Sequence, residues 1–235
     1  MVGAVARRQE DLFDTRPTSG PSRAEIIARY RHLRAISLQL HDDILKRVSP
    51  DALLRQGRRL GLVSGRTWVL DDKDELHYAF DLAIHTAPPD KARAIDRYAR
   101  SAKFAPASDE AVTLEAMCKA KFTLLYIERR HETAGVIATD LCRRKELWLM
   151  DEGLELSVPL EYMIATRLFT PAEFSMTCGV TVPVDAAYFE AALQKLPHLG
   201  EKDIEEAAND RRFAEILYRL ALADGEGFEP TPDLA

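Results

Sequence analysis

Two histidines and an aspartate recur at four-residue intervals in the middle of the chain: His77, Asp81 and His85. On a helix this spacing places all three on one flank. Imidazole nitrogens and a carboxylate are ligands that suit Zn²⁺ or Fe²⁺. Eight residues span about 12 Å along a helix axis, however, so both histidines cannot bind one ion without a bend. Two interpretations therefore stay open: a metal site, and a polar helix flank with local His–Asp pairing.

A second pair, His41-Asp42, resembles the signature dyad of the HD phosphohydrolases. That family also needs another histidine and a distant aspartate from other helices to enclose its metal. Here the nearby histidine is His32, nine residues back on the same expected helix, and this spacing does not reproduce the enclosure. A dipeptide alone is weak evidence, so a metal-dependent hydrolase is kept only as an alternative function.

The densest basic cluster comprises Arg55, Arg58, Arg59 and Arg66. With Trp68 nearby, these side chains could neutralise and stack on a nucleic acid. Residues 61–65 are expected to be a turn and Thr67–Leu70 a strand, however, where a helix-turn-helix would need its recognition helix. The second interpretation is a solvated helix face. Glycines near this cluster lack the Gly-Lys-Ser/Thr of a phosphate loop and predict a helix stop and a turn.

Charge is distributed unevenly along the 235 residues, whose net charge is −6. Residues 1–70 carry 13 Lys/Arg against 7 Asp/Glu, whereas residues 151–235 carry 6 against 17. The basic and acidic ends are expected to face each other, within one molecule or between subunits; a basic surface that meets phosphate is the alternative. The pI of about 5.6 argues against a dedicated DNA-binding protein.

Other features favour a protein without catalysis. No nucleophile or zincin motif occurs, so no catalytic residue and no cofactor are assigned. The three cysteines, Cys118, Cys142 and Cys178, are odd in number and far apart, which fits a reducing cytoplasm, and Cys178 is expected to be a buried structural thiol. No apolar run is long enough to span a membrane, and no signal-peptide core follows the first arginines.

The apolar periodicity predicts an α+β fold that changes character near Phe122. Before it, three-four spacing and caps such as Ser22, Ser49-Pro50 and Ser108 predict helices. After it, short apolar runs predict a small antiparallel β-sheet or barrel, and the chain then returns to helices. The expected division is a mobile arm (1–21), a helical region (22–121), a β unit (122–184), and C-terminal helices with a tail (185–235).

Two stretches carry a resemblance to a known group of proteins. One runs from Ser49-Pro50-Asp51 to Leu76 through Trp68-Val69-Leu70-Asp71-Asp72, and the other from Leu147-Trp148-Leu149-Met150 to Pro183 through Phe174-Ser175-Met176. Over residues 23–184 the chain resembles a family of uncharacterised bacterial proteins with a helical N-terminal half and a small β-rich unit. The resemblance implies no activity, cofactor or site residue.

The leading functional prediction is a cytoplasmic adaptor or binding protein that acts through protein–protein contacts or self-association. Its motivation is the oppositely charged ends and the acidic, amphipathic C-terminal helix, which could dock in a partner's groove. Nucleic-acid association through the arginine cluster and hydrolysis by a metal centre remain the alternatives.

Overall fold

The structure is a computed structural model that describes residues 20–194 and 204–224. The expected mobile arm lies almost wholly outside these residues, as does the tail. Within them the helices are α1 (Arg23–Leu45), α2 (Pro50–Leu60), α3 (Glu75–His85), α4 (Ala94–Ser101), α5 (Asp109–Cys118), α6 (Glu152–Ser157), α7 (Ala186–Gln194), α8 (Ile204–Asn209) and α9 (Arg211–Asp224). The strands are β1 (Val63–Ser64), β2 (Thr67–Trp68), β3 (Lys121–Arg130), β4 (Val136–Asp140), β5 (Lys145–Leu149), β6 (Tyr162–Phe169) and β7 (Met176–Pro183).

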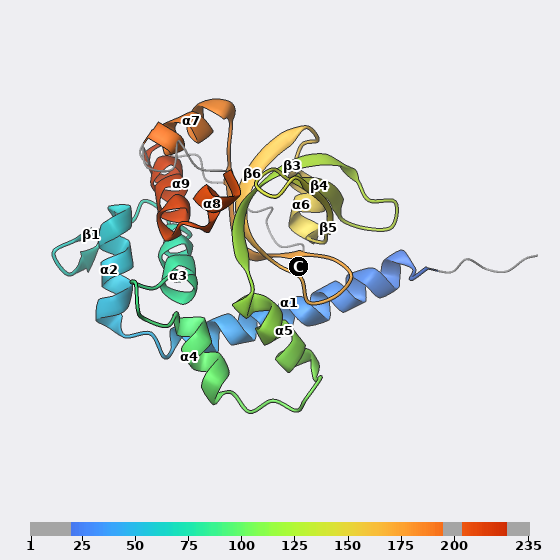
Figure 1. Ribbon diagram of the computed structural model, residues 1–235, viewed down its shortest axis with the longest axis horizontal. Coiled ribbons are helices and arrows are strands. Elements are labelled where there is room, and N and C mark those ends of the chain that lie inside the picture. Colours follow the sequence, from blue (N-terminus) through green and yellow to red (C-terminus); the bar gives the residue numbers. More distant parts are fainter. Residues whose placement is uncertain (1–19, 195–203, 225–235) are drawn as a thin grey trace, which may run out of the picture.

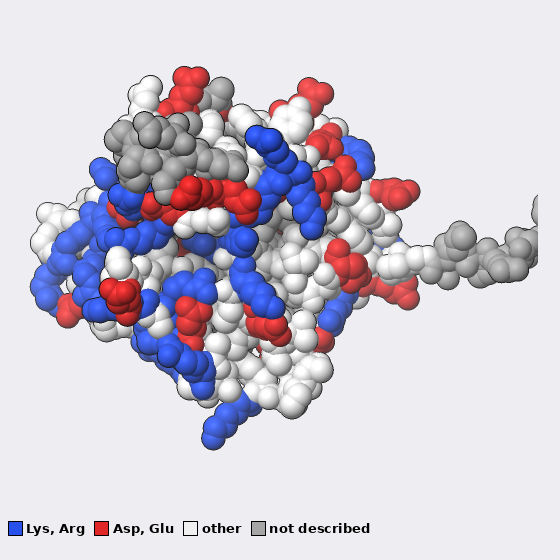
Figure 2. Space-filling model, viewed as in Figure 1, with Lys and Arg blue, Asp and Glu red and all other residues white. Residues whose placement is uncertain are grey.

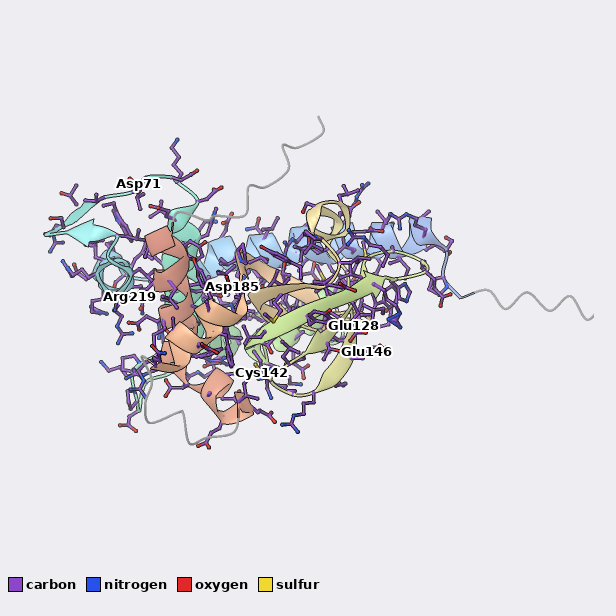
Figure 3. The ribbon with its side chains drawn as sticks, turned by 90° about the horizontal axis from the view of Figure 1, so that it is seen from above. Asp71, Glu128, Cys142, Glu146, Asp185 and Arg219 are labelled. Carbon is purple, nitrogen blue, oxygen red and sulfur yellow. The ribbon has the colours of Figure 1, made fainter. Side chains whose placement is uncertain are left out.

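Helix α1 is the longest element, and its start is fixed by the expected capping box. The Ser22 hydroxyl accepts the Glu25 backbone N–H, while the Glu25 carboxylate accepts the Ser22 N–H. Its 23 residues extend about 34 Å. One stripe, which includes Leu33 and Ile44, is buried against α4, α5 and the ends of the strands. Figures 1 and 3 show α1 as a long rod beside the sheet.

The main sheet is antiparallel, with strand order β5-β4-β3-β6-β7. Central β3 is buried on both faces, which explains its almost uninterrupted apolar sequence. Phe122 and Leu124 pack towards the C-terminal helices, whereas Leu125 and Ile127 pack on the opposite face with α6. The predicted α+β class, with helices before and after a small antiparallel sheet, is therefore confirmed.

The expected alternative of a closed barrel is wrong: the sheet is open in the described part of the chain. Its outer strands, β5 and β7, form no ladder with each other; one isolated bridge joins Leu149 of β5 to Ser175, the residue before β7. Because β5 has only five residues, it leaves most of β7 without a partner on that side. Helices cover the faces of the sheet instead.

Three local features differ from expectation. The segment around Gly65 is a hairpin, because β1 pairs with β2. The short helix α6 follows Asp151, whose side chain caps it, where no helix was expected. The final amphipathic helix, expected as one element over about 201–223, is two in its described part, because Asp210 accepts the Arg212 N–H and starts a new helix. Among the described helices, none is both long and apolar enough to cross a bilayer.

Candidate functional site

A buried ion pair links helix α3 to strand β6 of the main sheet. Arg167 of β6 donates two hydrogen bonds, of 2.8 and 2.9 Å, to the two carboxylate oxygens of Asp81. The Tyr218 hydroxyl of α9 donates a third, of 2.9 Å. Burial opposes the charge of Asp81, but the adjacent guanidinium lowers the pKa of that carboxyl below its usual value. Both groups therefore stay charged inside the protein.

The pairing of β6 with β7 is irregular beside Arg167. The register shifts between Thr166 and Leu168, whose partners on β7 are Thr181 and Thr177, so the extra residues lie on β7. The guanidinium lies 5.6 Å from the centre of the Phe122 ring, on the face of the sheet towards α3 and α9.

Beside this pair lies a cavity of about 560 Å³, here called the basic pocket. It is enclosed by the end of α3 and the following loop, the α5–β3 junction, and the start of α9. Six basic residues and one acidic residue line it: Lys91, Arg93, Lys119, Lys121, Arg167, Arg211 and Asp210. Figure 2 shows Lys and Arg side chains gathered over the middle of this face of the molecule. The lining is therefore predominantly basic, although the whole chain is net negative.

Several of these cations are not neutralised by neighbours. Arg93 pairs with Asp96, and Lys119 pairs with Glu115. Lys91, Lys121 and Arg211, by contrast, make no ion pair with any residue that the structure describes; Arg211 only donates to the Ala87 carbonyl at 3.4 Å. Cations that converge without acidic partners are suited to an anionic ligand.

The predicted arginine cluster is divided by the fold. Arg55 and Arg59 line an adjoining pocket of about 360 Å³, which shares Thr86, Ala87 and Lys91 with the basic pocket. Arg58 instead donates to the Gly65 carbonyl.

Arg66, the fourth member, pairs with Asp51 at 3.2 Å. Two of the four predicted residues thus line the adjoining pocket, where Arg59 also lies 3.6 Å from Glu215, and the other two hold the β1–β2 hairpin against α2.

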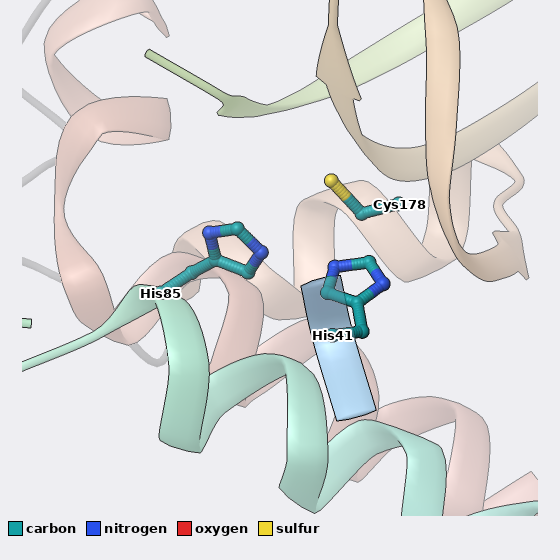
Figure 4. A group of neighbouring side chains, drawn as sticks. All are labelled: His41, His85 and Cys178. Atoms are coloured by element: carbon teal, nitrogen blue, oxygen red, sulfur yellow. The ribbon is translucent and has the colours of Figure 1, made fainter. Parts of the chain in front are cut away.

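The predicted metal-binding set on α3 is not assembled. His77 is exposed and lies 3.6 Å from Asp74, while the Asp81 carboxylate is held by Arg167. The cause is the length of the helix, which separates the two histidines along its axis. His85, the last residue of α3, is buried and lies against two residues from elsewhere: His41 of α1 and Cys178 of β7 (Figure 4).

These three side chains form a compact polar cluster inside the protein. Burial lowers the pKa of His41 to about 4 and holds that of His85 well below its usual value. Burial also raises the pKa of the Cys178 thiol to about 12. All three groups are therefore uncharged at neutral pH. Asp42, the other half of the sequence dyad, belongs to no such cluster among the described residues.

Sequence reasoning singled out His41 and His85 separately and treated Cys178 as structural. It missed Arg167, although a visible signal existed: one arginine stands in the apolar run Met163–Phe169. A charge in a buried strand is rare unless it is paired. The arginine therefore predicts a buried aspartate or glutamate as its partner. It also missed the basic pocket, because its cations come from four separate segments.

Comparison with curated proteins and with solved structures finds no match. A family model, described as a family of unknown function (DUF7986), matches residues 24–229. The match covers more than half of the chain and includes both pockets and the His41–His85–Cys178 cluster. The chain therefore belongs to the family of unknown function DUF7986.

Proposed function

We propose that the protein is a binding protein for a small molecule that carries phosphate groups, and that the basic pocket holds it. The observation that supports this most is the composition of the lining: six Lys/Arg against one Asp around about 560 Å³. Cavities of about 300–1,000 Å³ are typical of small-molecule sites.

The adjoining pocket favours a ligand with more than one charged group. It adds Arg55, Arg59 and Arg97 to the positive surface and meets the basic pocket at Lys91. The aromatic residue in the two linings is Phe122, which is only 4% exposed. Stacking on exposed aromatic rings is the usual mode of single-strand binding, so the lining favours a small polyanion over a nucleic acid.

The leading sequence prediction, an adaptor that acts through protein contacts, stays a prediction. It shares with the present proposal a binding role without an assigned catalytic residue. The nucleic-acid alternative stays open as well, because its Arg55 and Arg59 belong to the adjoining pocket.

Calorimetric titration of the full chain tests the proposal. The probes are inorganic phosphate, pyrophosphate and ATP, with citrate as a carboxylate control and a mixed-sequence DNA duplex as the macromolecular one. We expect binding that tightens from phosphate to pyrophosphate and weakens as salt is raised. Lys121→Ala and Arg211→Ala should each weaken it by about 10- to 150-fold, since a hydrogen bond to a charged group contributes about 1.5–3 kcal/mol.

The matched control is Lys103→Ala, because Lys103 is exposed and lines neither pocket. It should bind like the unaltered protein. Equal losses in all three variants, or no binding of any phosphate compound, would contradict the proposal. Binding of the duplex alone would support the nucleic-acid alternative instead.

A further inference from the structure

The cluster of His41, His85 and Cys178 is assembled from three distant parts of the chain. His41 comes from α1, His85 ends α3, and Cys178 lies in β7. Their potential ligand atoms, two imidazole nitrogens and a thiol sulfur, all lie within 4.8 Å of one another. Figure 4 shows the two rings and the sulfur converging from these elements, and the rings meet edge to face with centroids 6.0 Å apart.

His85 supplies an independent observation that points to a ligand. Its side chain is 4% exposed, and neither of its ring nitrogens has a hydrogen-bond partner. A buried polar atom without a partner costs about 1–3 kcal/mol, so such atoms are rare in native proteins unless something else binds them. Asp81, four residues earlier on the same helix, is held by Arg167 and Tyr218 and makes no hydrogen bond to His85.

The three donor atoms fit a zinc-like ion by type and by distance. Cysteine sulfur and histidine nitrogen are common Zn²⁺ ligands, with bonds of about 2.3 and 2.0–2.1 Å. In a tetrahedron these bond lengths put neighbouring donor atoms about 3.3–3.6 Å apart. From a separation within 4.8 Å, the side chains need to close by about 1.5 Å or less, which small side-chain rotations can supply.

We infer that His41, His85 and Cys178 bind one divalent zinc ion. Each contributes one ligand atom, and the fourth coordination position is left to water, because no further His, Cys, Asp or Glu in the described residues joins the group. On binding, the Cys178 thiol becomes a thiolate and its proton passes to the solvent. The neighbouring Asp81–Arg167 pair adds no net charge to the site. This inference does not depend on the anionic ligand proposed above.

The first test uses the full chain, freed of metal and then titrated with Zn²⁺ and with Co²⁺. We expect one equivalent of each to bind. Bound Co²⁺ should show the thiolate-to-metal charge-transfer band in the near ultraviolet and the visible bands of a tetrahedral ion. Cys178→Ala should abolish the charge-transfer band, whereas Cys142→Ala, which removes another buried thiol, should leave it in place.

The second test separates metal binding from folding. His85→Phe replaces an unpartnered buried ring with an apolar one of similar size, so the metal-free variant should unfold at a temperature equal to or above that of the unaltered protein. Its Zn²⁺ affinity should nevertheless fall at least about 100-fold, since even removal of a residue that only orients a ligand costs about 10–100-fold. Zn²⁺ should therefore raise the unfolding temperature of the unaltered protein and not that of the variant.

Three results would overturn the inference: no stoichiometric binding of either ion, a cobalt spectrum without the thiolate band, or equal Zn²⁺ affinity in the unaltered protein, Cys178→Ala and His85→Phe. None of these measurements involves a phosphate compound. Failure here and failure of the proposed function are therefore distinguishable.

Discussion

At the scale of single residues, Arg167 has the most demanding environment in the described part of the chain. It lies in β6 and is 6% exposed, and its guanidinium, paired with Asp81, lies beside the basic pocket and the histidine–cysteine cluster. Arg167 stays charged because the Asp81 carboxylate supplies the opposite charge and is itself held by the Tyr218 hydroxyl.

The first prediction concerns this pair. Arg167→Met leaves the Asp81 carboxylate buried without a counter-charge, so the free energy of unfolding should fall by about 3–5 kcal/mol. Adding Asp81→Leu should restore much of the loss, because a buried ion pair is often replaceable by apolar side chains. Urea denaturation of both variants measures this. As a control, Glu115→Gln breaks the exposed pair with Lys119 and should cost at most about 1 kcal/mol. A double variant no more stable than the single one would contradict the argument.

Residue by residue, the sequence indicated only part of the candidate site. Histidines and arginines are conspicuous, so His41, His85, Arg55 and Arg59 could be named in advance. Which of them meet is decided by contacts between segments more than 40 residues apart, and no local spacing encodes these. The triad on α3 illustrates the point, since a regular four-residue spacing spread its members along the helix axis instead of gathering them.

At the scale of elements, caps and turns were the most readable signals. The N-terminal caps Ser22, Ser49 and Ser108 all form as expected, and Gly61 ends α2 with a positive φ of 85°. The six-residue α6 was missed because one and a half turns show no periodicity. The break at Asp210 was missed because the apolar pattern continues across it.

A second prediction tests how α2 packs on the hairpin. A Cβ added at Gly57 would lie 2.5 Å from the Trp68 ring and 2.6 Å from Val63. Overpacking of this kind costs about 1–3 kcal/mol, so Gly57→Ala should destabilise the protein even though alanine is the better helix former by about 1 kcal/mol. Gly153→Ala in α6 is the matched control, because its Cβ would meet only Asp151 at 3.4 Å. The unfolding temperature of Gly57→Ala should lie below that of the control. The reverse order would show that the β1–β2 hairpin moves to make room for the added methyl group at little cost.

At the scale of the whole molecule, the opposite charges of the two ends of the chain meet within one protein. Arg23 pairs with Glu155, and Arg31 pairs with Glu152. Arg59 lies 3.6 Å from Glu215 of α9. In each case a basic residue from the first 70 positions contacts an acidic residue beyond position 150. The interpretation of the charge asymmetry as intramolecular pairing is thus supported for these residues.

A third prediction follows from these contacts. Since the arginine of each pair is exposed, each pair contributes at most about 1 kcal/mol, and salt screens it. Raising sodium chloride should lower the unfolding temperature of the unaltered protein. The double variant Glu152→Gln with Glu155→Gln should start lower and depend less on salt. The control Glu115→Gln removes the local pair between Glu115 of α5 and Lys119, the residue that caps this helix. This variant should keep most of the salt dependence. If the unfolding temperatures of all three proteins depend on salt to the same extent, these ion pairs do not contribute to stability.

The contacts of α1 also bear on the order in which the molecule is completed. Arg34 of this helix donates to the backbone carbonyl of Thr177, and His41 lies beside Cys178. A ribosome makes α1 early, yet the strand that receives it emerges more than 130 residues later. Until β7 has been synthesised, the side of α1 that contacts it stays exposed. The final packing of α1 therefore cannot form until late in translation, and the exposed side must be protected from wrong contacts until then.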